Sequence, residues 1–212
     1  MITLFALTIA AYILGSIPSA VWVGKAVRGV DVREHGSGNM GATNVARVIG
    51  VPWALLVALV DIAKGFAPVF WLGPVAGQAV GLLPDDARLI LGAAAIIGHL
   101  YPAFAGFKGG KGVLTAAGVF LAIMPIEIAL AIALWGVVFA ITRIVSVGSL
   151  VAAAGLVAIV FLRRFVWDTP IANSTLAATV IMVALVFYTH RSNLRRLRTG
   201  GEASFKKGEA GS

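Results

Sequence analysis

The chain has 212 residues, of which 59% are hydrophobic and 12% are charged, and its mean hydropathy is +0.96. A soluble domain is about 45–50% apolar, so this composition indicates a protein that crosses a membrane several times. The net charge of +8 then suggests orientation by cytoplasmic Lys and Arg, and we expect no nucleic-acid partner. The sequence contains no cysteine, which excludes disulfides, thiolate chemistry and cysteine-ligated metal.

Seven apolar stretches follow one another along the chain. A full membrane span needs about 20 residues, and the fourth stretch is shorter than that. We therefore predict an all-α integral membrane protein, a polytopic bundle of about seven transmembrane helices, with five spans and re-entrant segments as the alternative. The stretches are 2–24, 52–73, 88–104, 112–124, 126–142, 145–162 and 171–189.

The same reading predicts one transmembrane domain over residues 1–198. The first stretch has no basic segment before it, so we expect a retained helix and not a cleaved signal. Residues 199–212 are polar and rich in Gly and Lys, and we expect a disordered cytoplasmic tail.

The basic residues concentrate in every second segment that connects these stretches. With the N-terminus outside, most of the 17 Lys and Arg residues fall on the inner side, which is the positive-inside pattern. This predicts an outer N-terminus and a cytoplasmic C-terminus, with all three histidines near the inner face. The inner basic residues are Lys25, Arg28, Arg33, Arg47, Lys108, Lys111, Arg143, Arg191, Arg195, Arg196, Arg198, Lys206 and Lys207.

A polar, glycine-punctuated segment covers residues 33–50. Its glycines allow φ > 0 and close approach to main-chain N–H groups, and its short polar side chains add hydrogen-bonding groups. With Arg33 and Arg47 at its ends, such a loop suits an oxyanion. The alternative is a flexible surface loop with a helix cap at Thr43 or Asn44. The residues concerned are Gly36, Ser37, Gly38, Asn39, Gly41, Thr43 and Asn44.

A second glycine-rich, basic element covers residues 98–112. It is not a Walker A loop, because Ala105 stands where the first Gly is required and Gly112 follows the Lys in place of Ser or Thr. Its backbone N–H groups beside Lys111, ahead of a helix, still favour an anion. A lone histidine near a helix end is more often structural, but His99 lies within a dozen residues of this loop.

Two features lie inside apolar stretches. Pro18, within Gly15–Ser19, removes a helix hydrogen bond and is expected to kink or end the first helix. Asp61 and Lys64 are spaced i, i+3 and so share a helix face. Ionisable groups in a membrane tend to face a bundle interior or a wet cavity, so this pair is either a structural ion pair or part of a substrate site.

The C-terminal half adds further polar groups on the predicted inner side. Ser149 follows Arg143, an expected snorkelling anchor. His190 and Asn193 share a face if the last helix continues past residue 190. The arginines beyond Asn193 can contact anionic lipid headgroups.

These groups suit a reaction between a lipid-like and a phosphorylated molecule at the bilayer edge. Several enzyme classes are disfavoured: there is no G-x-S-x-G elbow around Ser37 and no H-E-x-x-H motif. There is also no H-x4-D acyltransferase signature, because Met40, Phe104 and Arg195 stand five residues after the three histidines. A transporter for phosphorylated metabolites is the competing class, although the anion motifs gather at one face and no internal repeat is visible. A non-catalytic lipid-binding scaffold would explain the basic tail only.

Four motifs together resemble the bacterial acyl-phosphate-dependent glycerol-3-phosphate acyltransferase family, over nearly the whole chain. They are Gly15-Ser16-Ile17-Pro18-Ser19, the run from Gly36 to Arg47, Gly98-His99 with Phe107-Lys108-Gly109-Gly110-Lys111-Gly112, and His190-Arg191-Ser192-Asn193. The resemblance implies a polytopic enzyme of the bacterial inner membrane with its active site at the cytoplasmic face. It would transfer a fatty acyl group from acyl phosphate to the 1-hydroxyl of glycerol 3-phosphate, giving lysophosphatidic acid and phosphate.

The resemblance also implies roles for individual residues. We expect Ser37, Asn39 and His99 to be catalytic, with His99 orienting the attacking hydroxyl or assisting proton transfer. We expect no metal or organic cofactor, membrane lipids as surroundings, and a monomer. The expected substrate-binding residues are Gly38, Gly41, Thr43, Asn44, Arg47, Lys108, Gly109, Gly110, Lys111, Gly112, Ser149, His190 and Asn193.

Overall fold

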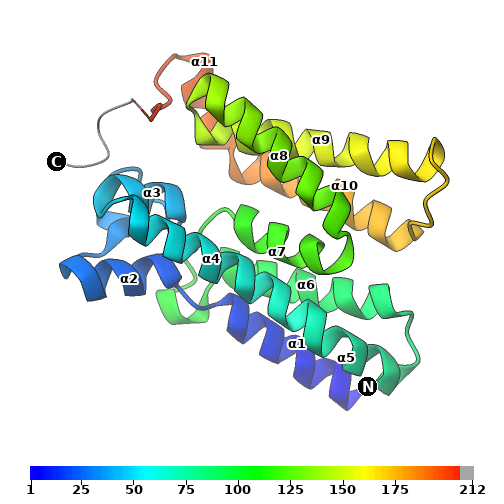
Figure 1. The fold of residues 1–212 in the computed structure, drawn as a ribbon. Helices are drawn as coiled ribbons and strands as arrows, with labels where there is room; N and C mark the ends of the chain where they lie inside the picture. Colours follow the sequence, from blue (N-terminus) through cyan, green and yellow to red (C-terminus); the bar gives the residue numbers. More distant parts are fainter. Residues whose placement is uncertain (206–212) are drawn as a thin grey trace. The chain divides into compact units, whose positions relative to one another are not determined.

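The computed structural model describes residues 1–205 and is built from helices (Figure 1). The described chain forms two compact units, one covering Met1–Ile123 and the other beginning at Met124. Each unit is considered by itself. The prediction of an all-α membrane protein is confirmed, whereas a single domain over residues 1–198 stays a prediction.

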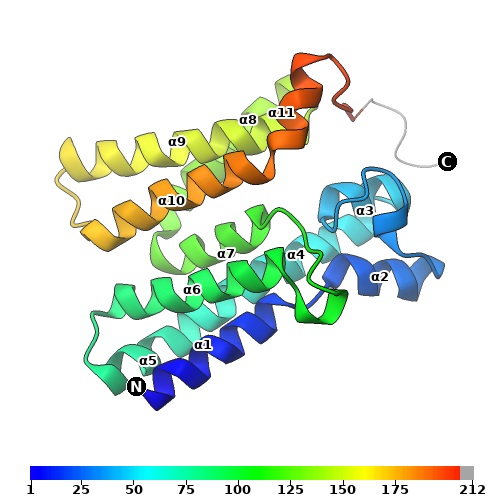
Figure 2. The same ribbon diagram turned by 180° about the vertical axis from the view of Figure 1, so that it is seen from behind.

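The first unit contains seven α-helices and three shorter turns. Helix α6 packs against α1, α5 and α7, and α4 packs against α3 and α7 (Figures 1 and 2). The elements are α1 (Ile2–Gly15), α2 (Ser19–Arg28), η1 (Val32–Glu34), α3 (Ala42–Val48), α4 (Val51–Ala67), the π-helical η2 (Pro68–Leu72), α5 (Gly73–Val80), α6 (Pro84–Leu100), η3 (Ala103–Ala105) and α7 (Val113–Ile123).

Glycines bring the backbones of these helices into contact. A Cβ on Gly15 would collide with the Ala95 carbonyl of α6, and one on Gly98 would collide with the Tyr12 carbonyl of α1. Gly65 of α4 lies in the same way against the Thr115 carbonyl of α7. Small residues at such crossings are how membrane helices gain van der Waals contact where lipid removes the hydrophobic drive. These glycines therefore hold the helix pairs of the first unit together.

The first helix is broken, as Pro18 predicts. Helix α1 ends at Gly15 and α2 begins at Ser19. The carbonyl of Ile17 in the break accepts a hydrogen bond from Lys64 Nζ at 2.8 Å. Side-chain and backbone partners near a proline make such breaks tolerable within a membrane.

Five helical segments of the described chain are long and apolar enough to cross a membrane: Ile2–Arg28, Val51–Val80, Pro84–Ala105, Pro125–Thr142 and Val145–Phe165. A sixth appears if Asn173–Thr189 and Arg191–Arg198, bent by 56°, form one span. The fourth predicted stretch becomes α7, whose 11 residues reach about 17 Å at about 1.5 Å per residue, against a hydrocarbon core of about 30 Å. All seven stretches are helical, while the count of seven spans stays a prediction.

The second unit consists of α8 (Pro125–Thr142), α9 (Val145–Phe165), α10 (Asn173–Thr189) and α11 (Arg191–Arg198). Helix α9 packs against both α8 and α10. An ion pair of 3.2 Å joins the buried Glu127 of α8 to Arg163 of α9.

The start of the predicted disordered tail makes contacts within its own unit, and the disorder of 199–212 stays a prediction. Glu202 makes three side-chain hydrogen bonds, and the Phe205 N–H donates to the Arg143 carbonyl at 2.9 Å. Residues 199–205 thus contact the rest of their unit, because one carboxylate among basic residues finds several donors. The remainder of the predicted tail, 206–212, lies outside the described residues.

Candidate functional site

The loop between η1 and α3 presents Ser37 from a fixed backbone. Asn44 Oδ1 accepts the Ser37 N–H at 2.8 Å and the Ser37 hydroxyl at 3.1 Å. Asn44 Nδ2 donates to the carbonyls of Val32 and His35, at 2.7 and 3.1 Å. Asn44 is only 1% exposed, whereas Ser37 is exposed. The buried amide therefore shapes the loop and holds the hydroxyl of the exposed residue Ser37.

The glycines of this loop serve its turn geometry. Gly36 and Gly38 have φ of 61° and 68°, the left-handed region that favours glycine. Helix α3 begins at Ala42, with Gly41 as its N-cap and without a side-chain cap. The predicted cap at Thr43 or Asn44 is wrong, because the Asn44 amide is used across the loop instead. Thr43 lies in the first turn of α3.

Arg33 ties the two glycine-rich loops together. It forms a two-point ion pair with Asp31, with Nη2–Oδ2 2.8 Å and Nε–Oδ1 3.0 Å, and its Nη1 donates to the Ala105 carbonyl at 2.8 Å. The hydrogen bonds from Arg33 lower the pKa of Asp31 to about 2. The same pairing with Asp31 raises the pKa of Arg33. Arg33 therefore links the two loops through its ion pair with Asp31, the Asp31–Arg33 clasp, and through its hydrogen bond to Ala105. Its guanidinium is used within the protein, and not as the anion-binding cation expected at the edge of the first loop.

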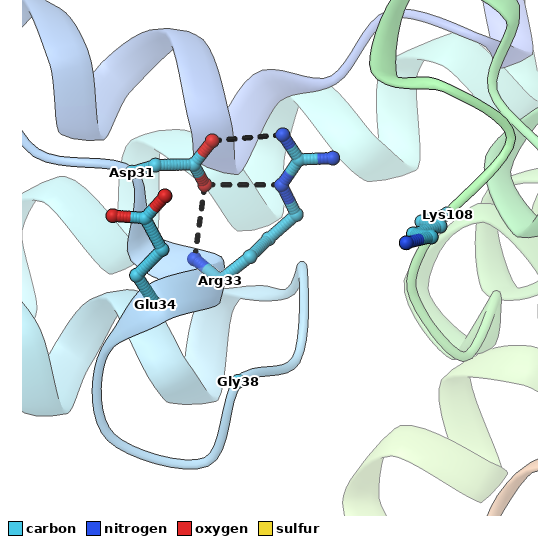
Figure 3. A pocket seen from close by; sticks show the side chains of 6 residues that line it. Asp31, Arg33, Glu34, Gly38 and Lys108 are labelled. Carbon is cyan, nitrogen blue, oxygen red and sulfur yellow. Dashed lines mark hydrogen bonds and ion pairs between the residues drawn. The ribbon is translucent and has the colours of Figure 1, made fainter.

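A cavity of about 390 Å³ lies between these loops (Figure 3). Its wall contains the Asp31–Arg33 pair on one side, and Lys108 approaches from the second loop (Figure 3). The lining residues are Asp31, Arg33, Glu34, Gly38, Lys108 and Gly109. Three predicted binding residues, Gly38 of the first loop and Lys108 and Gly109 of the second, thus line one polar cavity.

The second loop folds back onto the end of α6. The N–H groups of Gly109 and Gly110 donate to the carbonyls of Leu100 and His99, at 3.1 and 3.2 Å. A Cβ on Gly110 would collide with His99 Nε2 and with the Met40 carbonyl. The structure thus brings His99, the second loop and Met40 of the first loop into contact.

The backbone N–H groups are used differently from the predicted anion nest. Besides Gly109 and Gly110, the Gly38 and Gly41 N–H groups donate to the carbonyls of His35 and Asn39, both at 3.1 Å. These donors are occupied within the loops, since short glycine turns pair their own N–H groups. Positive side chains in and beside these loops are the exposed Arg47 of α3 and Lys108, and the half-buried Lys111 next to Gly112. That they bind an anion stays a prediction.

The second unit gathers its own predicted residues at one end. Ser149, His190 and Asn193 are buried at 7%, 3% and 5% exposure. His190 Nδ1 lies 2.8 Å from the Val186 carbonyl, which can only accept and therefore fixes a proton on Nδ1. That these residues act with Arg47 and Lys111 of the first unit stays a prediction.

Glu202 is the site-adjacent residue that the sequence reasoning missed. Its carboxylate accepts hydrogen bonds from Asn193 Nδ2, from Ser146 Oγ at 2.7 Å and from Arg196 Nε at 2.7 Å. Burial raises its pKa, but these hydrogen bonds outweigh burial and lower the pKa of Glu202 overall. A single acidic residue just beyond a run of arginines was the available signal.

Asp61 and Lys64 form the predicted ion pair, at 2.8 Å between Nζ and Oδ1, with both side chains 2% exposed. Among the described residues, no three His, Asp or Glu side chains are grouped so that they could hold a metal ion.

Comparison with known proteins extends the likeness over the whole chain. Residues 5–200 match the family model described as glycerol-3-phosphate acyltransferase. A glycerol-3-phosphate acyltransferase of Chlorobaculum tepidum is 40% identical over 95% of this chain and 96% of its own length. That of Salinibacter ruber is 39% identical over 99% of this chain and 95% of its own.

The fold is also that of a solved enzyme. The crystal structure of PlsY (YgiH), an integral membrane glycerol 3-phosphate acyltransferase, in its glycerol 3-phosphate form matches with a TM-score of 0.80 and 38% identity, over 96% of each chain. Its lysophosphatidic acid form matches with the same score and identity. With a family model that covers both units and relatives of this identity, the chain belongs to the glycerol-3-phosphate acyltransferase family.

Proposed function

We propose that this protein transfers a fatty acyl group from acyl phosphate to the 1-hydroxyl of glycerol 3-phosphate. The hydroxyl oxygen bonds to the acyl carbonyl carbon, and the bond from that carbon to the phosphate oxygen breaks. Lysophosphatidic acid and inorganic phosphate are the products. The hydroxyl proton passes to the departing phosphate or to His99, so no other reactant is needed.

The observation that carries this proposal is the Ser37 side chain, held by the buried Asn44 and next in sequence to Gly38, which lines a polar cavity together with Lys108. Acyl phosphate is a mixed anhydride with a good leaving group, so positioning and charge stabilisation are the main tasks left to the enzyme. The fixed Ser37 side chain suits positioning, and the Lys108 ammonium at the cavity suits charge stabilisation. The absence of an H-x4-D sequence fits a donor other than acyl-CoA or acyl carrier protein.

Within this proposal, Ser37 and Asn39 hold the acyl phosphate and the developing oxyanion. Arg47, Lys111, His190 and Asn193 bind the phosphate of glycerol 3-phosphate, with Ser149 near it. Gly109 and Gly110 act by letting the second loop lie against His99, because their N–H groups are occupied. The acyl tail lies along apolar helix faces within the bilayer.

The positive-inside pattern supports a location in the bacterial inner membrane, with the glycine-rich loops at the cytoplasmic face. The enzyme would then meet soluble glycerol 3-phosphate on the side where metabolism supplies it. We propose that it works as a monomer, without a metal or an organic cofactor.

The test uses purified protein in detergent or lipidic mesophase with palmitoyl phosphate and glycerol 3-phosphate, followed by phosphate release. Palmitoyl-CoA serves as the parallel donor. We expect phosphate release that requires glycerol 3-phosphate, and no turnover with palmitoyl-CoA. Equal turnover with palmitoyl-CoA would overturn the donor assignment.

Paired serine variants locate the chemistry. Ser37→Ala should lower turnover by at least about 100-fold, in the range of losing an oxyanion donor. Ser174→Ala, at the end of α10 opposite to His190, is the matched control and should leave turnover unchanged.

The competing function is a transporter for phosphorylated metabolites. Uptake of glycerol 3-phosphate into liposomes without any phosphate release would indicate that function instead of acyl transfer.

A further inference from the structure

His99 has a buried ring nitrogen without a hydrogen-bond partner in the described chain. This atom, Nδ1, belongs to a side chain 4% exposed and lies 3.8 Å from Asp61 Oδ1. The distance exceeds a hydrogen bond by about 1 Å. A buried polar atom without a hydrogen bond lowers the stability of the folded state, and this one lies near a carboxylate.

The Asp61 carboxylate is held firmly in place. Its Oδ1 accepts the hydroxyl of Ser19 at 2.7 Å and lies 2.8 Å from Lys64 Nζ. Lys64 in turn donates to the Ile17 carbonyl in the break of the first helix. Residues of three helices, Ser19 of α2, Lys64 of α4 and His99 of α6, therefore lie around one carboxylate.

The opposite edge of the His99 ring faces the glycine loops. Nε2 lies where a Cβ on Gly110 would collide with it, and the Met40 carbonyl borders the same position. An imidazole with a proton on Nδ1 leaves a lone pair on Nε2. The ring thus has one edge toward the buried carboxylate and the other toward the proposed reaction site.

We propose that Asp61 is a positioning residue for His99: its carboxylate keeps the proton on Nδ1 and so leaves Nε2 as a proton acceptor toward the glycine loops. Ser19 and Lys64 hold this carboxylate in place. This inference rests on the proposed acyl transfer, in which His99 receives or steers the hydroxyl proton of glycerol 3-phosphate. Across 3.8 Å the negative carboxylate attracts a proton on the ring nitrogen that lies nearest to it, so it favours the Nδ1–H tautomer even without a hydrogen bond.

A purely structural role makes a different prediction. If Asp61 only neutralises Lys64, removal of both charges should restore what removal of one destroys. Asp61→Asn/Lys64→Met does this while it keeps the side-chain volumes similar. If Asp61 positions His99, the double variant stays impaired.

The first experiment reads the tautomer directly, without turnover. Protein labelled with 15N-histidine gives few ring signals, because the chain has three histidines, and His99→Gln assigns the one of interest. We expect a protonated Nδ1 and an unprotonated Nε2 in the parent, and a shift toward protonated Nε2 in Asp61→Asn. A parent His99 with its proton on Nε2 would overturn the proposal, whatever the enzyme's reaction proves to be.

The second experiment measures kcat and KM for glycerol 3-phosphate. Asp61→Asn and Asp61→Asn/Lys64→Met should both lower kcat by about 10- to 100-fold, part of the usual range for proton-transfer assistance, with KM unchanged. Asp85→Asn breaks the other i, i+3 ion pair, with Arg88, and should leave both parameters unchanged. Recovery of kcat in the double variant would overturn the positioning role, whereas an inactive parent with the expected tautomer would place the failure in the proposed function.

Discussion

Asn44 Oδ1 accepts two hydrogen bonds from Ser37, one from its N–H at 2.8 Å and one from its hydroxyl at 3.1 Å. The exposed serine is thus fixed by a buried amide seven residues further on. The orientation of the proposed catalytic hydroxyl is therefore set by a residue that need not touch a substrate.

Asn44→Ala should damage both stability and turnover, because it removes every hydrogen bond of that amide. The loss of several buried hydrogen bonds should cost about 2–4 kcal/mol of unfolding free energy. Ser37→Ala should lower turnover by at least about 100-fold but leave the melting temperature nearly unchanged. Thermal melting in detergent and phosphate release measure the two effects. Equal melting of the two variants would contradict this division of roles.

Gly110→Ala should lower turnover strongly, because the added Cβ collides with His99 Nε2 and with the Met40 carbonyl. Gly136→Ala is the matched control: a Cβ there meets nothing within 4 Å, and alanine favours a helix. We expect a loss of at least about 10-fold in kcat/KM for Gly110→Ala, as a misplaced catalytic group can cost that or more. Parent-like turnover would mean that this close approach is dispensable.

The Asp31–Arg33 clasp should make stability depend on pH in acid. Since the folded-state pKa of Asp31 is about 2, below its ordinary 3.8, the folded state binds the proton less readily than the unfolded state. Its contribution is complete above about pH 4, declines as the pH falls, and is gone below about pH 2. The melting difference between the parent and Asp31→Asn should therefore be constant from pH 7 to 5 and shrink towards pH 2. A difference that grows in acid would contradict the assignment.

Glu202→Gln should destabilise the second unit. Gln keeps the shape but loses the charge that three donors meet, from Asn193, Ser146 and Arg196. We expect a lower melting temperature together with a higher KM for glycerol 3-phosphate, because Asn193 loses its charged anchor. Glu34→Gln, an exposed carboxylate of the first unit, is the control for melting. An unchanged melting temperature in Glu202→Gln would show that the tail contacts carry no stability.

The proposed orientation can be tested on a chain without native cysteine. Single cysteines at exposed Arg28, Leu83 and Ser204 report on the first loop, the α5–α6 connection and the tail. A membrane-impermeant maleimide added to intact cells should label Leu83→Cys but not Arg28→Cys or Ser204→Cys. The reverse pattern would overturn the cytoplasmic placement of the glycine-rich loops.

The helical fold was predictable because apolar runs of span length leave the backbone few other ways to pair its N–H and C=O groups in lipid. The break at Pro18 and the ion pair of Asp61 with Lys64 followed from local rules on proline and on helix spacing. The 11-residue α7 shows what the apolar pattern cannot predict. An apolar run indicates a helix, but it does not establish that the helix crosses the membrane.

The sequence predicted the two glycine-rich loops as segments but not the contacts within them. The backbone donors of Gly109 and Gly110, expected to bind an anion, are used internally, and the catalytic roles of Ser37 and His99 stay predictions. Arg33 likewise pairs with Asp31 and Ala105. Which donors remain depends on how two loops far apart in sequence meet, and no local pattern encodes that. Glu202 was missed because its partners lie on three separate segments.

The glycine crossings of the first unit carry a consequence for how the enzyme can diversify. At Gly15, Gly65 and Gly98, the backbone of one helix contacts the backbone of another. A side chain at any of these three crossings would collide with a neighbouring carbonyl, so the glycines cannot be replaced by larger residues without moving the helices. Substitutions that adapt the enzyme to lipids of another length or to a colder membrane are therefore expected on the lipid-facing surfaces of the helices. The glycine crossings would stay constant among related enzymes while the lipid-facing side chains vary.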